Sequence, residues 1–171
     1  MKIVPAFIVL MIAAAVVMAQ PPQNRFKETT AATEEVATRY FYAYMALDWN
    51  KLEPLMHADI TFEDPTGTLL FGENRPAGKS DVIGGFRTGL AALTHMTPKI
   101  RRKFFSGTAG VFEMDLTFGF RNRQNQEVNI TMPLVVVLKV KDGKVIEHRD
   151  YGGYRDYVKQ VAAASKAASA S

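Results

Sequence analysis

His148 and Asp150 are the residues of this sequence best suited to chemistry, and they lie two positions apart in the stretch His-Arg-Asp-Tyr. Residues at this spacing on a β-strand share one face, so the imidazole and the carboxylate can form a proton-transfer pair. Glu113 and Asp115 repeat the spacing on an earlier predicted strand. A group of carboxylates around one imidazole is typical of general acid–base catalysis.

Asp64 and Tyr40 are two further candidates. Asp64 follows the alternating stretch Ile-Thr-Phe-Glu and precedes Pro65, and it could act as an alternative base across a cavity. Tyr40 could donate a hydrogen bond to negative charge that develops on a substrate. Each candidate also has a structural interpretation: Asp64 as a turn residue bonded to local backbone, Tyr40 as a core aromatic, and His148 as a pocket-lining or surface histidine without catalytic work.

A divalent metal bound by Glu113, His148 and nearby carboxylates is a weaker alternative, because two strands separate these residues by roughly 10 Å. His57 and His95 lie at the ends of predicted elements, where a histidine without a special function is expected. The sequence therefore predicts no metal and no other cofactor.

Three helices, followed by a series of strands, must position these residues. In residues 33–47 apolar side chains recur at offsets of four, four and three, which predicts a helix, and Ser80 is a good cap for another. Gly84 and Gly85 within that helix indicate close packing or the approach of a ligand. Helices are predicted at 33–47, at 51–57 and after Ser80, and strands at 60–64, at 68–71 as its hairpin partner, and at 99–105, 111–120, 128–140 and 144–151. Helices followed by strands predict an α+β fold with an antiparallel sheet.

The predicted strand 111–120 has one apolar face and one partly acidic face. The apolar face carries Phe112, Met114, Leu116, Phe118 and Phe120, and the other carries Val111, Glu113, Asp115 and Thr117. Two interpretations are open: the polar face meets solvent, or the acids face a polar cavity while the apolar row packs against a second subunit. Such a row left in water would form a larger patch than monomers usually expose, so the sequence predicts a homodimer through the outer sheet face.

The first nineteen residues have the pattern of a secretory signal peptide, with Lys2, an apolar run and cleavage before Gln20. The run is short and is interrupted by Pro5, which disfavours a retained membrane anchor. We therefore expect an exported protein, in the periplasm or the medium, with no membrane contact after cleavage. Residues 20–32 are expected to be flexible and the Ala/Ser/Lys-rich residues 159–171 to be a disordered tail, which leaves 33–158 as the domain.

Composition limits the classes of function. Removing 19 of the 171 residues leaves 152, which suits one domain of ordinary size. The remaining 20 basic and 17 acidic side chains give a net charge of +3, and no basic run is longer than Arg101-Arg102-Lys103. Nucleic-acid binding would need a larger basic face. The chain has no cysteine, so disulfides and thiol chemistry are excluded.

Five short motifs, between residues 34 and 157, carry a resemblance to a known family. They are Thr38-Arg39-Tyr40, Phe62-Glu63-Asp64-Pro65, Gly78-Lys79, Asp142-Gly143-Lys144-Val145 and His148-Arg149-Asp150-Tyr151. In this order and spacing the chain resembles the SnoaL-like branch of the nuclear transport factor 2-like superfamily. The resemblance implies a cone-shaped α+β fold in which three N-terminal helices pack on a strongly curved sheet and leave a deep pocket. It also implies dimers through the sheet, which favours the second interpretation of the strand 111–120.

The resemblance bears on individual residues. Tyr40 and Asp64 fall where ketosteroid isomerases carry their donor tyrosine and general base, but the strand 128–140 has Met132 or Pro133 where a protonated acid is needed. The stretch His148-Arg149-Asp150-Tyr151 is similar to Trp-Arg-Asp-Tyr of limonene-epoxide hydrolases, which carries an active-site aspartate at the position of Asp150. Their second motif, Arg-x-Asp, reads Glu113-Met114-Asp115 here, so the arginine is missing. Steroid isomerisation and epoxide hydrolysis are therefore both disfavoured. His148 and Asp150 are more similar to the histidine and aspartate that the resemblance to SnoaL-like cyclases implies as proton-transfer groups.

Three classes of function stay open. The first is cofactor-free acid–base catalysis on a small, mostly apolar molecule, with Asp150 and His148 as proton-transfer groups, Asp64 as the alternative base and Tyr40 as donor. The pocket is then expected to include Asp115, Glu113, Tyr44, Phe86 and Met132. The second is a ligand carrier with the same pocket and no turnover. The third is an interaction module whose sheet face recruits partners.

Overall fold

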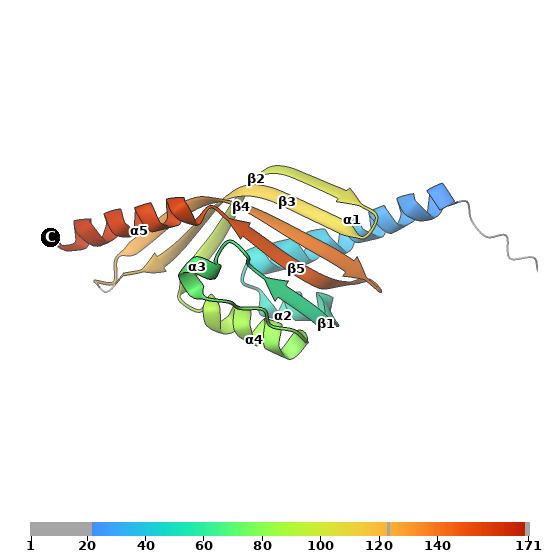
Figure 1. Ribbon diagram of the computed structural model, residues 1–171, viewed down its shortest axis with the longest axis horizontal. Helices are drawn as coiled ribbons and strands as arrows, with labels where there is room; N and C mark the ends of the chain where they lie inside the picture. Colours follow the sequence, from blue (N-terminus) through green and yellow to red (C-terminus); the bar gives the residue numbers. More distant parts are fainter. Residues whose placement is uncertain (1–21, 123, 170–171) are drawn as a thin grey trace, which may run out of the picture.

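Helices cover one face of a five-stranded sheet in the computed structural model, which describes residues 22–122 and 124–169 (Figure 1). The expected signal peptide, residues 1–19, lies outside the described residues. In chain order the elements are α1 (Pro22–Met45), α2 (Trp49–Leu52), the 3-10 turn η1 (Glu53–Leu55), β1 (Met56–Glu63), α3 (Thr68–Phe71), α4 (Lys79–Gly89), β2 (Leu93–Ser106), β3 (Ala109–Arg121), β4 (Glu127–Lys141), β5 (Lys144–Gly152) and α5 (Tyr154–Ser169).

The sheet has the strand order β1-β5-β4-β3-β2. The strands β2 to β5 form an antiparallel meander, and the predicted turn between β4 and β5 has Asp142 and Gly143 at φ of 50° and 70°, as a tight hairpin requires. β1 departs from the expected antiparallel pattern, since it joins the edge parallel to β5. The chain passes through α3, α4 and the strands β2, β3 and β4 before β5 returns beside β1. The expected α+β fold with a curved sheet is confirmed.

Residues 68–71 form the short helix α3, where the sequence predicted a hairpin strand. The edge of β1 that this strand would have used for a ladder makes only an isolated bridge, from Thr61 to Ala77. Asp64 also stops the strand, because its carboxylate accepts hydrogen bonds from the Thr66 hydroxyl and the Gly67 backbone N–H at 2.9 and 2.8 Å. Such a local turn competes with strand pairing.

The first helix begins at Pro22, well before the expected start at residue 33, so residues 22–32 are helical where flexibility was expected. A contact outside the helix explains the difference. The Thr30 hydroxyl accepts a hydrogen bond from the Gly107 backbone N–H at 3.0 Å, and the Phe26 ring lies against Gly107 in the same β2–β3 turn. Once the packed part of a helix has formed, each added residue gains one backbone hydrogen bond.

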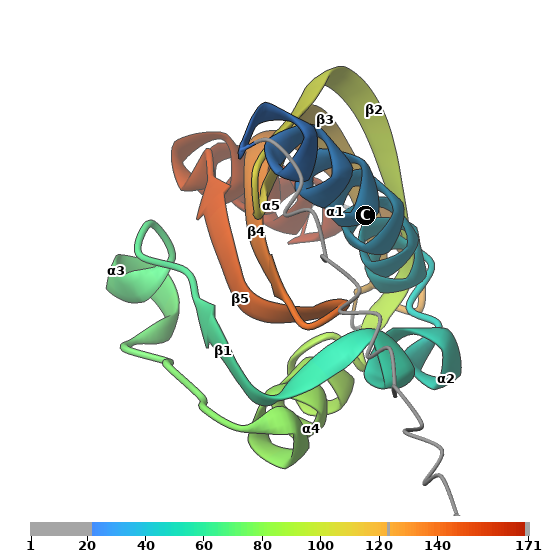
Figure 2. The same ribbon diagram turned by 90° about the vertical axis from the view of Figure 1, so that its right-hand side faces the viewer.

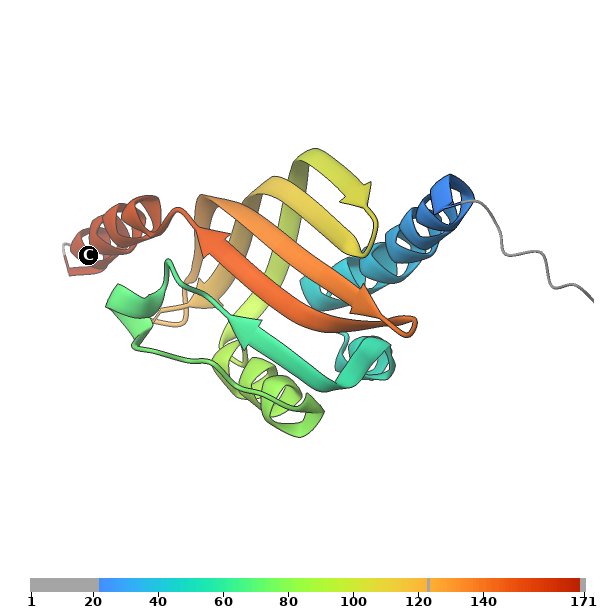
Figure 3. The same cartoon turned by 45° about the vertical axis from the view of Figure 1, so that its right-hand side comes forward.

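The C-terminal segment is also helical, as α5 continues to Ser169 through most of the expected disordered tail of residues 159–171. Its first turns are anchored, because Tyr157 and Val161 pack against the core and the Gln160 side chain bonds both backbone groups of Thr131. The following residues are rich in alanine, the best helix former, and extend away from the body (Figures 1 and 3). Among the helices described, none combines the length and the apolar character needed to cross a membrane.

The apolar row of β3 faces inward, which corrects the expectation that it meets a second subunit. Phe112 and Met114 are fully buried, and the Phe112 ring stacks on Phe41 of α1 with centroids 4.1 Å apart. Figure 2 shows why: the curved sheet wraps around α1, so the helix covers the concave face. The row therefore gives no reason to expect a dimer, and the alternating polar residues point outward.

Candidate functional site

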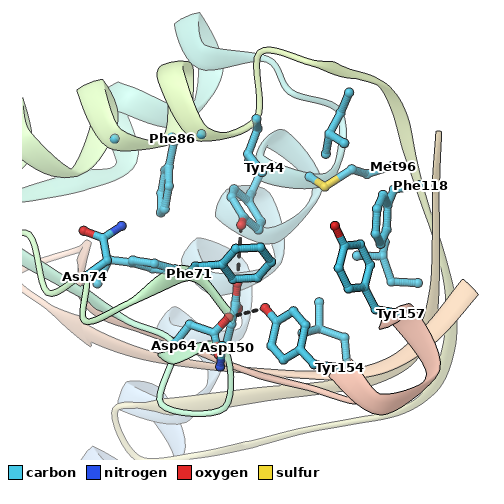
Figure 4. A pocket seen from close by; sticks show the side chains of 18 of the residues that line it. Tyr44, Asp64, Phe71, Asn74, Phe86, Met96, Phe118, Asp150, Tyr154 and Tyr157 are labelled. Carbon is cyan, nitrogen blue, oxygen red and sulfur yellow. Dashed lines mark hydrogen bonds between the residues drawn. The ribbon is translucent and has the colours of Figure 1, made fainter. Parts of the chain in front are cut away.

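A cavity of about 390 Å³ opens between the concave face of the sheet and the helices α3, α4 and α5 (Figure 4). This volume lies within the range of roughly 300–1,000 Å³ that is usual for small-ligand sites. Most of the wall is aromatic or aliphatic, from Phe62 on β1 round to Tyr157 on α5. Asp64 and Asp150 are the two charged side chains in the described lining, and no lysine or arginine is among the lining residues. The cavity is therefore apolar, with negative charge at two points.

Asp150 reaches the cavity because β5 alternates between its two faces. His148 and Asp150 point inward, whereas Arg149 and Tyr151 are exposed on the outer face. Asp150 is only 7% exposed and lines the wall. The Tyr44 hydroxyl on α1 donates to Asp150 Oδ2 at 3.3 Å, and Figure 4 shows the two side chains pointing toward each other.

His148 lies behind Asp150 and is completely buried. Its Nε2 is 2.9 Å from Asp150 Oδ1, and its Nδ1 is 3.1 Å from the hydroxyl of Tyr40. Tyr40, Tyr44, Phe62 and Phe86 surround the imidazole with ring centroids 4.8 to 5.6 Å away. The result is a continuous buried chain of hydrogen bonds, Tyr40–His148–Asp150–Tyr44, of which Asp150 and Tyr44 touch the cavity.

The two tyrosines in this chain keep their phenolic hydrogens, and Tyr44 donates its hydrogen to Asp150. Burial raises the pKa of Tyr40 well above its usual range, and the nearby charge of Asp150 raises it further. Burial and Asp150 act in the same way on the pKa of Tyr44. Both phenols therefore keep their protons at neutral pH, and each has one hydrogen to donate.

Asp64 also lines the cavity, but both of its oxygens are occupied. Oδ1 accepts from Thr66 and Gly67, and Oδ2 accepts a short hydrogen bond from the Tyr154 hydroxyl (Figure 4). Burial, together with the hydrogen bond and the charge of Asp64, raises the pKa of Tyr154. Asp64 thus ties the start of α5 to the loop after β1, and three hydrogen bonds engage its carboxylate where two engage Asp150.

The structure brings together some of the predicted residues and separates others. Tyr44, Phe86 and Met132 line the cavity with Asp64 and Asp150. Tyr40 and His148 do not line it, since they form the layer behind Asp150.

Glu113 and Asp115 were expected in the pocket and are instead on the outer face of β3. They are hydrogen-bonded there to Arg102 and Arg101 of β2, at 2.6 and 2.5 Å. The Arg102 guanidinium holds the pKa of Glu113 below its usual range. Because Glu113 and the buried His148 lie on opposite faces of the sheet, the two cannot share a metal ion.

Several lining residues were missed. Tyr154 and Tyr157 lie three apart at the start of α5, a helical spacing that would have indicated an inward-facing stripe. Phe71 of α3 was expected in a strand. Gly85 was expected to mark close packing or the approach of a ligand; it lines the cavity, and nothing lies within 4 Å of the place where a Cβ would be.

Solved structures with low sequence identity share this fold. A proposed SnoaL-like polyketide cyclase from Shewanella denitrificans OS-217 has a TM-score of 0.68 at 18% identity, over 77% of this chain and 97% of that chain. An LEH-like epoxide hydrolase from M. tuberculosis has a TM-score of 0.62 at 18% identity, over 77% and 90% of the two chains. A proposed ketosteroid isomerase from Kribbella flavida DSM 17836 has a TM-score of 0.54 at 21% identity, over 72% and 78%. At these identities the likeness is one of fold, and it confirms the nuclear transport factor 2-like architecture.

Sequence comparison gives the family. No curated protein matches the chain in sequence. The sequence profile of the SnoaL-like domain matches residues 37–148, a segment that begins in α1 beside Tyr40 and ends at the buried His148. This match covers more than half of the chain, and the chain belongs to the SnoaL-like domain family.

Proposed function

We propose that this protein binds a small, mostly apolar organic molecule in the cavity and catalyses proton transfer on it with its own side chains. Asp150 would exchange the proton with the substrate, His148 would support it from behind, and Tyr44 would hold its second oxygen. The observation that carries the proposal is the position of Asp150, a nearly buried carboxylate at the wall of an apolar cavity with both oxygens hydrogen-bonded.

The surroundings of Asp150 suit this chemistry. Apolar walls exclude water, so charges and hydrogen-bond donors near the carboxylate act more strongly than they would in solvent. Two carboxylates without a facing cation would repel an anionic ligand, so the cavity disfavours anions. Isomerisation, dehydration, ring closure and hydrolysis all proceed through proton transfer and remain open to such a site.

Two of the reactions found in related families have less support. The Tyr40 hydroxyl is bonded to His148 and does not face the cavity, so it cannot serve as the donor that a ketosteroid isomerase needs there. No arginine is among the lining residues described, so an epoxide oxygen would lack its usual partner.

A carrier without turnover is the second candidate. Its support is the largely apolar wall, in which hydrogen bonds within the chain already engage both oxygens of Asp64 and both oxygens of Asp150. A ligand site of this kind needs few polar groups.

One experiment separates the two candidates. Native mass spectrometry of the protein from its own host, before and after organic extraction, would show whether a small molecule is retained and what it is. The extracted compound and close analogues are then incubated with the wild type, with Asp150→Asn and with Asp115→Asn. The last variant removes a carboxylate on the outer face and serves as the control.

For an enzyme, we expect the wild type and Asp115→Asn to convert one of these compounds and Asp150→Asn to be at least about 100-fold slower while still binding it. Binding without conversion by any of the three proteins would favour the carrier. Equal turnover by Asp150→Asn and wild type would rule out the assigned catalytic group.

Export also belongs to the proposal, on the strength of the signal-peptide pattern in residues 1–19. Sequencing the N-terminus of the protein from the host's periplasm or medium tests it. A chain that begins at Gln20 is expected, and an intact Met1 in the cytoplasm would contradict export.

A further inference from the structure

We infer that Tyr40, which does not touch the cavity, is a positioning residue that holds His148 in the tautomer with its hydrogen on Nε2 and thereby keeps Asp150 as a carboxylate that accepts protons. The catalytic consequence rests on the proposed function, whereas the tautomer does not.

The argument begins with the single hydrogen on the Tyr40 hydroxyl. The side chain is completely buried, and within the described part of the chain the hydroxyl has one hydrogen-bond partner, His148 Nδ1 at 3.1 Å. If Nδ1 carried a hydrogen and donated it to Tyr40, the hydrogen of the phenol would need another acceptor, and the described residues supply none. Buried polar groups are nearly always paired, so Tyr40 donates and Nδ1 accepts.

The second step follows along the ring. A neutral imidazole with an unprotonated Nδ1 carries its hydrogen on Nε2, which then donates to Asp150 Oδ1 at 2.9 Å. An imidazolium, or the opposite tautomer, would put a hydrogen on Nδ1 and leave the phenol hydrogen of Tyr40 without an acceptor. The pairing of Tyr40 thus decides the state of a nitrogen on the far side of the ring.

The third step concerns Asp150 itself. Oδ1 faces the hydrogen on Nε2, and Oδ2 faces the hydroxyl of Tyr44. Neither neighbour accepts a hydrogen in this arrangement, so a carboxylic acid proton on Asp150 would have no partner within the chain. Asp150 therefore meets the ligand as a carboxylate with two fixed donors behind it.

This assignment selects the direction of the first proton transfer. A C–H or O–H bond of the substrate breaks, its electron pair stays on the substrate, and a new O–H bond forms on Asp150, while His148 remains neutral. The class of substrate is thus a mostly apolar molecule with an acidic C–H or O–H group, and the proton on Asp150 is available for return to the product.

The test is nitrogen NMR of protein labelled with 15N-histidine. The chain has three histidines, and the signals of His57 and His95 are identified by His57→Gln and His95→Gln. For wild-type His148 we expect one protonated nitrogen and one hydrogen-bonded, unprotonated nitrogen, with the proton on Nε2. A proton on Nδ1, or on both nitrogens, would overturn the inference without any variant.

Tyr40→Phe then tests the cause. It keeps the ring and removes the hydroxyl, so the Nδ1 signal is expected to lose its hydrogen-bond shift and the two tautomers to mix. The matched control is Tyr42→Phe, at a half-exposed position on the same helix. An unchanged His148 spectrum in folded Tyr40→Phe would show that Tyr40 does not set the tautomer.

Turnover of the compound identified under the proposed function provides a separate readout. For Tyr40→Phe we expect kcat to fall up to about tenfold with little change in KM. A tenfold fall in kcat corresponds to the loss of one neutral hydrogen bond. If Asp150→Asn proves fully active, the proposed function fails while the tautomer assignment stands on its spectrum. If the spectrum disagrees while Asp150→Asn is inactive, the present inference alone fails.

Discussion

Tyr154, the first residue of α5, donates a hydrogen bond to the Oδ2 atom of Asp64, in the loop that follows β1. The same carboxylate accepts from the Thr66 hydroxyl, whose oxygen in turn accepts from the Gly152 backbone N–H at 2.7 Å. The end of β5, the start of α5 and the loop that leads into α3 are therefore joined at one point beside the cavity.

This junction should show strong coupling in a double-mutant cycle. Tyr154→Phe and Asp64→Asn each leave partly buried polar groups unpaired, so each should lower the free energy of unfolding by about 1–3 kcal/mol, and the double variant should lose less than the sum. Denaturant unfolding measures all four proteins. Tyr151→Phe, at an exposed position on β5, is the control and should change little. Strictly additive losses would mean that the bond adds nothing to stability.

Phe71 of α3 should slow the escape of a bound molecule. It lines the cavity and contacts the rings of Tyr154 and Tyr157, with centroids 5.5 and 6.1 Å away, yet it is 61% exposed. Phe71→Ala should therefore change stability little and raise the dissociation rate of Nile red, a neutral apolar fluorophore, several-fold. Leu69→Ala, on the same helix but outside the lining, should leave the rate unchanged. Equal rates for both variants would show that α3 does not cover the ligand.

The sequence was sufficient for contacts set by spacing along one element. His148 and Asp150 were expected to share a strand face, and the structure shows the hydrogen bond between them. The sequence alone could not show which of the two tyrosines, Tyr40 or Tyr44, reaches the cavity. Tyr40 and Tyr44 are four residues apart on the same helical stripe, about 6 Å along the axis, and the place where β5 crosses α1 decides that Tyr44 meets Asp150.

The error over Glu113 and Asp115 has a different physical origin. Alternation along a strand shows which residues share a face, but not what covers that face. Here α1 covers the apolar side of β3, and Arg101 and Arg102 on the neighbouring strand neutralise the acids outside. Likewise, the helical state of residues 22–32 depends on a contact with Gly107, which is remote in sequence.

The ion pair between Glu113 and Arg102 should contribute to stability in a pH-dependent way. Because Arg102 lowers the pKa of Glu113 in the folded protein, the contribution is present above the ordinary glutamate pKa of about 4.5 and is lost as pH falls through the lower folded value. The difference in unfolding free energy between wild type and Glu113→Gln should therefore shrink on acidification. Arg102 is exposed and Glu113 is partly exposed, so high salt should also reduce this difference.

Glu73→Gln is the control for this titration, because the structure gives that carboxylate no ion pair with any described residue. Its difference from wild type should stay near zero across the same pH range. A Glu113→Gln difference that is constant from pH 7 to below pH 4 would show that the pair does not couple to folding.

The two adjacent glycines of α4 allow cavity shape to be separated from helix stability. Gly84 and Gly85 both have open space where a Cβ would lie, but only Gly85 is among the residues that line the cavity. Leucine is a far better helix former than glycine, so Gly84→Leu and Gly85→Leu should each raise helix stability, by up to about 1 kcal/mol. Only Gly85→Leu puts a side chain into the mouth of the cavity, and it alone should weaken Nile red binding, by tenfold or more. Fluorescence titration gives the affinity and thermal unfolding the stability. If both variants bind Nile red as wild type does, the probe does not occupy the space beside α4, and the ligand site must lie deeper, against Tyr44 and Asp150.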